Sequence, residues 1–188
     1  MPINFKLMAV YYPSDCEVEI PDHVCDPCEA REKGRVGDVA FIKNTFEFTD
    51  PTNPTEWQTG INARDIIIIP GVLGSFDGGS EVLGAGYGRQ SESFIGYNFT
   101  SNFKDPNYKS NCEFYNLLKN SKNYRYAFKT ETQIHITNNP VVVIPKNPVT
   151  EDLNSDVVWD VLVKWADKDV PCPFDEPAGI FECFTVAP

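Results

Sequence analysis

Cysteine is the residue type of this chain best suited to chemistry, and the chain has six cysteines. Cys25 and Cys28 are separated by two residues, the spacing at which two thiolates hold one tetrahedral zinc ion from a tight turn. Because the chain has no second C-x-x-C motif, the other ligands must be isolated cysteines, and one near the C-terminus would join the two chain ends. The candidate ligands of a structural zinc site are Cys16, Cys25, Cys28 and Cys183, with Cys172 as the alternative to Cys183 and His23 close to the motif.

The competing interpretation of these cysteines is a set of reduced, partly buried thiols in a proline-rich loop. A thioredoxin-type redox role is disfavoured, because this C-x-x-C motif does not lie between a strand and a helix of a βαβ unit. Structural zinc is therefore the only cofactor that the sequence suggests.

Histidine is scarce, and only His23 and His135 are present. His135 lies in the alternating segment QIHI, where a hydrogen-bonded packing or surface histidine is favoured. The chain has no G-x-S-x-G elbow and no cysteine followed by a suitably framed histidine, so nucleophilic catalysis is disfavoured. The glycines at Gly84, Gly86 and Gly88 lack the Gly-Lys-Ser/Thr ending of a phosphate-binding loop. We therefore expect a protein that is not an enzyme.

The charge of the chain disfavours nucleic acid as a direct partner. There are 16 Lys and Arg residues against 27 Asp and Glu residues, a formal net charge of −11, whereas phosphate binding needs clustered cations. The N-terminus lacks a signal-peptide pattern, and the longest aliphatic run, residues 66–69, is too short to cross a bilayer. We expect no membrane partner and a protein made in a cytoplasm, where cysteines stay reduced.

The elements that must position these residues are mostly strands. Residues 64–70 (RDIIIIP) predict a strand with both faces covered, because the aliphatic side chains are continuous. Residues 157–165 show the cleanest alternation of apolar and polar residues. The expected strands are residues 4–11, 36–48, 64–70, 89–103, 124–129, 133–137, 141–144 and 157–165.

The sequence indicates two helices. For the first, only a short helix start is recognisable. Asn53 followed by Pro54 is typical of a capped helix start. The main helix is predicted at residues 110–120, opening at a Ser110 cap, and spacing places three apolar side chains on one face. These three are Phe114, Leu117 and Leu118.

Together the elements predict a single mainly β domain over residues 1–188. Its fold class is a β-sandwich or open barrel of about eight strands with one short α-helix (about 110–120) and long loops. The predicted excursions are a Cys/Pro-rich loop or arm at 12–35, a Gly-rich hairpin or extended loop at 71–88 and a Pro/Cys-rich tail at 166–188. Such loops commonly make the contacts with partners.

Several segments between residues 25 and 183 are similar, in their residues and in their order along the chain, to segments of a known group of proteins. They are GRVGDVAFI (34–42), DPTNPTEW (50–57), DGGS (77–80), DPNY (105–108), CEFYN (112–116) and WDVLVKW (159–165). In texture and order they resemble virion structural proteins of tailed bacteriophages that infect Bacteroidetes, the crAss-like group in particular.

The resemblance implies a particle component without catalytic residues. Either a tail-tube or connector-ring protein or a capsid auxiliary protein fits, with self-association and other virion proteins as partners. The expected location is the virion, assembled in the host cytoplasm. Tube proteins have a long inter-subunit arm, which only residues 12–35 or 71–88 can supply here. The alternatives are a carbohydrate- or receptor-binding β-sandwich of a phage fibre and, resting on the cysteines alone, a small metal-dependent enzyme.

Overall fold

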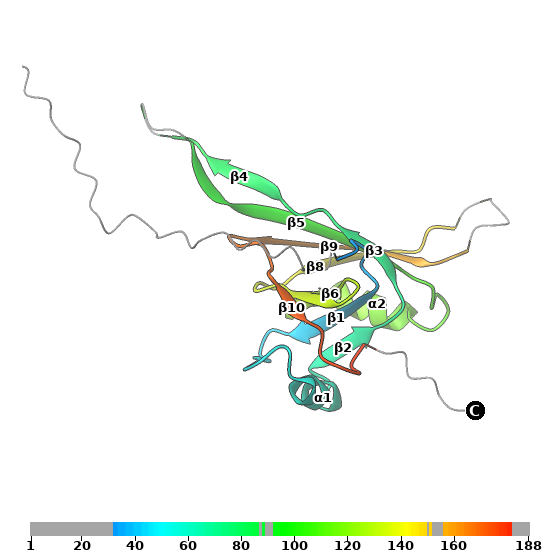
Figure 1. Cartoon of the computed structure of the whole chain (residues 1–188). Coiled ribbons are helices and arrows are strands. Elements are labelled where there is room, and N and C mark those ends of the chain that lie inside the picture. Colours follow the sequence, from blue (N-terminus) through cyan, green and yellow to red (C-terminus); the bar gives the residue numbers. More distant parts are fainter. Residues whose placement is uncertain (1–31, 87, 89–91, 150, 152–155, 182–188) are drawn as a thin grey trace, which may run out of the picture. The chain divides into compact units, whose positions relative to one another are not determined.

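The structure, a computed structural model, describes residues 32–86, 88, 92–149, 151 and 156–181 (Figure 1). The compact unit that contains them begins at Glu32. The expected strand at 4–11 and most of the expected arm at 12–35 lie outside the described residues. The elements are β1 (Asp38–Lys43), α1 (Pro54–Asn62), β2 (Ile66–Ile69), β3 (Leu73–Phe76), β4 (Ser80–Gly84), β5 (Ser93–Asp105), α2 (Cys112–Leu118), β6 (Tyr124–Lys129), β7 (Gln133–Ile136), β8 (Val142–Lys146), β9 (Trp159–Asp167) and β10 (Pro173–Asp175).

The strands form two antiparallel sheets, which confirms the predicted mainly β class. The first sheet has the order β10-β7-β6-β1-β2. The second has the order β3-β5-β9-β8, and β4 pairs with β5 beyond β3. Neither sheet closes into a barrel, and the arrangement is consistent with a β-sandwich-like fold. None of the described helices is long and apolar enough to cross a membrane.

Strand β1 shows why the first sheet is buried on both faces. Val39 and Phe41 point into the core between the sheets, whereas Ala40 and Ile42 point into a second core on the outer face. All four are fully buried. Helix α1 covers the outer face with Trp57, so the fold has a third layer. The aliphatic run of β2 divides its side chains between the same two cores, as its sequence predicts.

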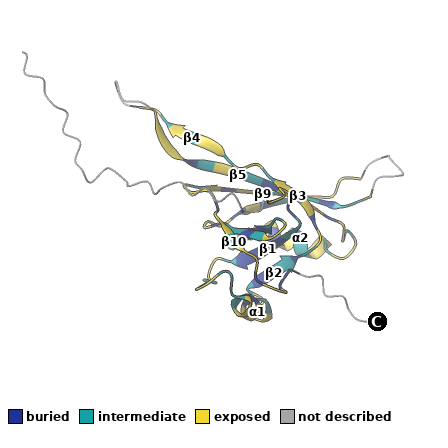
Figure 2. Cartoon of the chain, viewed as in Figure 1, coloured by how far each residue is buried: buried dark blue, intermediate teal, exposed yellow. Residues whose placement is uncertain are grey.

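Strand β9 confirms the predicted alternation. Its buried side chains are Trp159, Val161, Val163 and Trp165. Their neighbours are half-buried or exposed because they lie on the other face of the second sheet (Figure 2).

The two helices begin differently from one another. At α1 the prediction is confirmed, since Asn53 Oδ1 accepts a hydrogen bond of 3.0 Å from the Thr55 amide. At α2 the predicted Ser110 cap is wrong, because the capping position is Asn111. The Asn111 side chain makes no capping bond and instead donates to Asp105 Oδ2 at 3.1 Å. A buried carboxylate thus takes the group that would otherwise cap the helix.

Half of the Gly-rich residues 71–88 lie in strands. β3 and β4 both run antiparallel to β5, so the segment is one side of a long hairpin. Gly78 and Gly79 separate the two strands with φ of +77° and +90°, a conformation that favours glycine. Asp77 Oδ1 holds the turn by accepting from the Gly79 and Thr100 amides. The predicted tail at 166–188 also contains strand residues, because β9 runs to Asp167 and β10 covers Pro173–Asp175.

Candidate functional site

The end of the β4–β5 hairpin is a two-stranded ribbon. β9 pairs with β5 only from Tyr97 onward, so within the described residues the preceding part of β5 pairs with β4 alone, although Gly96 also lies against the backbone of Asp167. We call residues 80–84 and 93–96 the apolar ribbon. Figure 1 shows it extending past the end of β9. A two-stranded hairpin has little stability of its own in water, and its side chains need another surface.

Apolar side chains are exposed on both faces of the apolar ribbon. Val82 pairs with Gly96 and Leu83 with Phe94, which leaves Ile95 as an extra residue in a bulge. The bulge turns Phe94 to the same face as Tyr97, while Ile95 lies against Gly84 on the other face. Leu83, Phe94 and Ile95 are 51%, 50% and 54% exposed. Figure 2 shows the exposed stretch along both strands.

A run of aromatic rings joins the apolar ribbon to the core. The rings of Phe94 and Tyr97 are 4.8 Å apart between centroids, and those of Tyr97 and Phe99 are 5.5 Å apart. Phe99 is buried and stacks on Trp165 at 5.2 Å. The ribbon is therefore anchored by packing at its base, and Phe94 is the exposed end of this run.

A second apolar surface lies beside α2. It is a hollow of about 250 Å³, and we call it the α2 hollow. Leu117 at its rim is 66% exposed. Its lining residues are Ile67, Phe114, Leu117, Leu118, Ser121 and Tyr124.

The orientation of α2 agrees with the predicted shared face and adds a buried residue that the sequence prediction did not include. Leu118 is buried as expected, but Tyr115 is the second buried residue and Leu117 faces outward. The Tyr115 hydroxyl donates to buried Asp105, and this bond sets the rotation of the helix. Phe114, Leu117 and Leu118 share one face as predicted, and that face forms a wall of the hollow.

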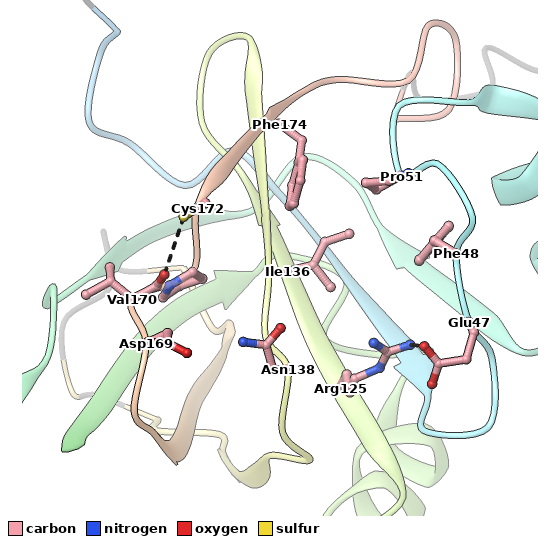
Figure 3. A pocket seen from close by; sticks show the side chains of 11 residues that line it. Glu47, Phe48, Pro51, Arg125, Ile136, Asn138, Asp169, Val170, Cys172 and Phe174 are labelled. Atoms are coloured by element: carbon pink, nitrogen blue, oxygen red, sulfur yellow. Dashed lines mark hydrogen bonds and ion pairs between the residues drawn. The ribbon is translucent and has the colours of Figure 1, made fainter. Parts of the chain in front are cut away.

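A third candidate, the polar pocket, lies on the outer face of the first sheet (Figure 3). Arg125 donates to the Phe46 carbonyl and lies 4.0 Å from the Glu47 carboxylate. Its Nε is buried and has no hydrogen-bond partner among the described residues. The pocket has a volume of about 440 Å³ and is lined by Glu47, Phe48, Pro51, Arg125, Ile136, Asn138, Asp169, Val170, Pro171, Cys172 and Phe174.

The predicted zinc ligands are not brought together in the described part of the chain. Of the candidate ligands only Cys172 is described, and it is exposed in the polar pocket. Within the described ranges no group of three or more His, Cys, Asp or Glu side chains is arranged to hold a metal ion. The zinc site therefore stays a prediction. The other candidate ligands lie outside the described ranges, and they are Cys16, Cys25, Cys28, Cys183 and His23.

His135 has the packing role that its sequence context favours. Its ring stacks on Phe128 with centroids 4.7 Å apart, and its Nδ1 lies 3.0 Å from the Pro171 carbonyl oxygen. The Cys172 thiol donates instead to the Val170 carbonyl at 3.8 Å. The imidazole and the thiol thus have separate partners.

No family model, curated protein or solved structure matches this chain. The fold and its surfaces define a mainly β, sandwich-like protein that presents an apolar ribbon, an apolar hollow and a polar pocket.

Proposed function

We propose that this protein is a non-enzymatic assembly protein whose copies bind one another, as a structural part of a bacteriophage virion. A tail or connector ring and a capsid auxiliary position both suit the resemblance in its sequence. The observation that carries the proposal is the apolar ribbon, which exposes Leu83, Phe94 and Ile95 over two faces. Clustered exposed apolar side chains on a projecting element mark an interaction surface.

The energetics favour assembly through repeated weak contacts. Burying the exposed half of Leu83, Phe94 or Ile95 contributes roughly 1 kcal/mol per side chain. Association loses at least several kcal/mol of translational and rotational free energy, so one such contact is weak. A closed assembly, in which each copy makes more than one contact, raises the effective concentration of the next contact. Assembly should therefore rise steeply with protein concentration.

The chemistry of the described residues is consistent with a non-enzymatic role. His135 is occupied by packing and by a carbonyl, and the buried carboxylate of Asp105 is occupied by donors from its own loop and helix. Both groups serve the fold. Of the three surfaces described above, the apolar ribbon and the α2 hollow are mainly apolar, and the polar pocket is mixed.

The test is the oligomeric state of the full chain by light scattering after size exclusion, over a series of concentrations. Species larger than the monomer should grow with concentration in the wild type. The double variant Leu83→Ser, Phe94→Ser should stay monomeric with an unchanged melting temperature. Val149→Ser is the matched control, because Val149 is 71% exposed but lies far along the chain from the ribbon. A wild type that is monomeric at every concentration overturns the proposal.

A second candidate function is carbohydrate or receptor binding, and the polar pocket favours it. Phe48 and Phe174 offer rings, and Asn138 offers an amide beside a largely buried guanidinium (Figure 3). Sugar rings bind through such a mixture of apolar faces and hydrogen-bonding groups. Binding of the unassembled protein to a glycan array, lost in Phe174→Ala and kept in Leu83→Ser, supports this function over the first.

A further inference from the structure

We propose that the apolar ribbon of one copy docks in the α2 hollow of the next copy, so that the copies join head to tail. This inference rests on the proposed function and names the receiving surface. The occupant of the hollow is a second copy of this chain.

The first argument is the position of the two surfaces along one strand. β5 begins in the ribbon at Ser93 and ends at Asp105, which Tyr115 of α2 contacts through a hydrogen bond of 2.8 Å. A strand of 13 residues spans about 40 Å at 3.3 Å per residue. The ribbon and the hollow therefore lie at opposite ends of β5. A ribbon cannot fold back into its own hollow without leaving the sheet.

The second argument is fit. An apolar cavity of about 150 Å³ is large enough to hold a benzene molecule. The α2 hollow has about 250 Å³, with one hydroxyl, that of Ser121, besides the phenol of Tyr124. It has room for the phenyl ring of Phe94, which is the one aromatic side chain of the described ribbon and is 50% exposed. Docking covers Leu117 at the same time, the most exposed apolar residue of α2.

The third argument is charge. The ribbon carries exposed Glu81, and Glu92 directly precedes its second strand. Exposed Lys119 and Lys122 follow α2 at the edge of the hollow, with Glu113 in the first turn of the helix as the acidic exception. Complementary charges around an apolar contact fix its register and speed the encounter. Added salt should therefore weaken the association.

A contact between two different surfaces has a defined consequence for symmetry. Each copy keeps a free ribbon at one end and a free hollow at the other, so addition continues until a ring closes or a filament grows. A contact of the ribbon with another ribbon would instead stop at a dimer. The two arrangements give different answers in a mixing experiment.

The experiment mixes two variants of the full chain. The ribbon variant Leu83→Ser, Phe94→Ser keeps its hollow, and the hollow variant Leu117→Asp keeps its ribbon. Each should be monomeric alone, and the mixture should form a one-to-one dimer and nothing larger, at higher concentration than the wild type needs because the pair makes a single contact. Leu73→Asp is the matched control, since Leu73 is exposed on β3 to a similar extent, and it should assemble as the wild type does.

Two outcomes overturn the inference while leaving the proposed function intact. In one, the wild type assembles but the mixed variants remain monomeric even at concentrations far above those at which the wild type assembles. In the other, Leu117→Asp assembles as the wild type does. A monomeric wild type overturns the proposed function itself, so the two failures are distinguishable. Circular dichroism and the melting temperature establish that each variant is folded, and Leu117→Ser replaces Leu117→Asp if the latter loses its fold.

Discussion

The hydroxyl of Tyr115 donates a hydrogen bond of 2.8 Å to Oδ2 of Asp105, a carboxylate with no exposed surface. Asn107 donates to Oδ1 of Asp105 from both its backbone N–H and its side-chain Nδ2. Asn111 donates to Oδ2 from its side-chain Nδ2. Burial raises the pKa of Tyr115 far above its ordinary value, and the Asp105 carboxylate raises it further. This network connects the end of β5 to α2 and so fixes one wall of the α2 hollow.

Removing the Tyr115 hydroxyl should destabilise the fold measurably. Tyr115→Phe deletes a hydrogen bond to a charged group and leaves one lone pair of buried Asp105 without its donor, a loss of about 1.5–3 kcal/mol. Urea unfolding followed by circular dichroism measures the change in the free energy of unfolding. Tyr108→Phe is the control, because the structural bond at Tyr108 is made by its backbone carbonyl. Equal effects of the two substitutions would contradict the role of the network.

Glu32 should remain ionised far below the pH at which an ordinary glutamate titrates. Its carboxylate accepts from the Thr132 amide and from the hydroxyls of Thr130 and Thr132, and these bonds lower its pKa to about 2. Because the folded pKa lies below the unfolded one, about 4.3, the ionised group stabilises the fold above that pH. This stability is lost as the pH falls from about 4.3 toward 2.

The side-chain carboxyl carbon shift of Glu32, followed by NMR against pH, measures this pKa directly. The melting temperature of the wild type should exceed that of Glu32→Gln at neutral pH, and the difference should shrink below about pH 4.3. Thr130→Val removes one donor and should raise the Glu32 pKa part of the way. A midpoint near the ordinary value in the wild type would be inconsistent with the observed bonds.

The elements that were predictable from sequence are those in which local pattern and tertiary environment agree. β9 alternates because one face meets the core, and Asn53 caps α1 with a bond inside its own turn. The sequence does not predict β3, because Gly74 interrupts the alternation of apolar and polar residues that is typical of a strand. A side chain at this position would lie 2.4 Å from the Asn102 carbonyl oxygen, so glycine is required by a neighbour that the sequence does not reveal. β10 has only three residues, too few for any period.

The candidate surfaces were less predictable, because they depend on register. Phe94 and Ile95 are adjacent apolar residues that interrupt the alternation of Tyr97 and Phe99, and this is the one sequence sign of the bulge. Which of them turns to which face depends on pairing with Val82 and Leu83 in another strand. The exposure of Leu117 likewise depends on what packs against α2, which helical spacing alone does not reveal.

The zinc site predicted from Cys25 and Cys28 has a direct test. Metal analysis of the full chain purified without chelator should show a stoichiometric zinc ion that Cys25→Ser removes. Cys112→Ser should keep the metal, because Cys112 is an exposed thiol on α2. If the ion is structural, its removal by a chelator should lower the melting temperature. A metal-free wild type would favour the alternative of reduced thiols.

Gly78 and Gly79 allow the base of the ribbon to be tested with two neighbouring substitutions. Both residues have positive φ, so an L-residue at either costs about 1–2 kcal/mol in backbone strain. A Cβ at Gly78 meets no atom within 4 Å, whereas a Cβ at Gly79 would lie 2.4 Å from the Phe99 ring. Phe99 cannot move aside easily, because it is buried and stacked on Trp165.

Gly79→Ala should therefore reduce the free energy of unfolding by about 1–3 kcal/mol more than Gly78→Ala does, the typical cost of overpacking a core. Urea unfolding of both variants measures this difference. Gly79→Ala should also weaken self-association more than Gly78→Ala, because displacement of Phe99 shifts Tyr97 and, through it, Phe94. If the two alanine variants unfold and assemble alike, then the Phe99 ring does not hold the ribbon in place, and the run of aromatic rings is not what positions Phe94 for its partner.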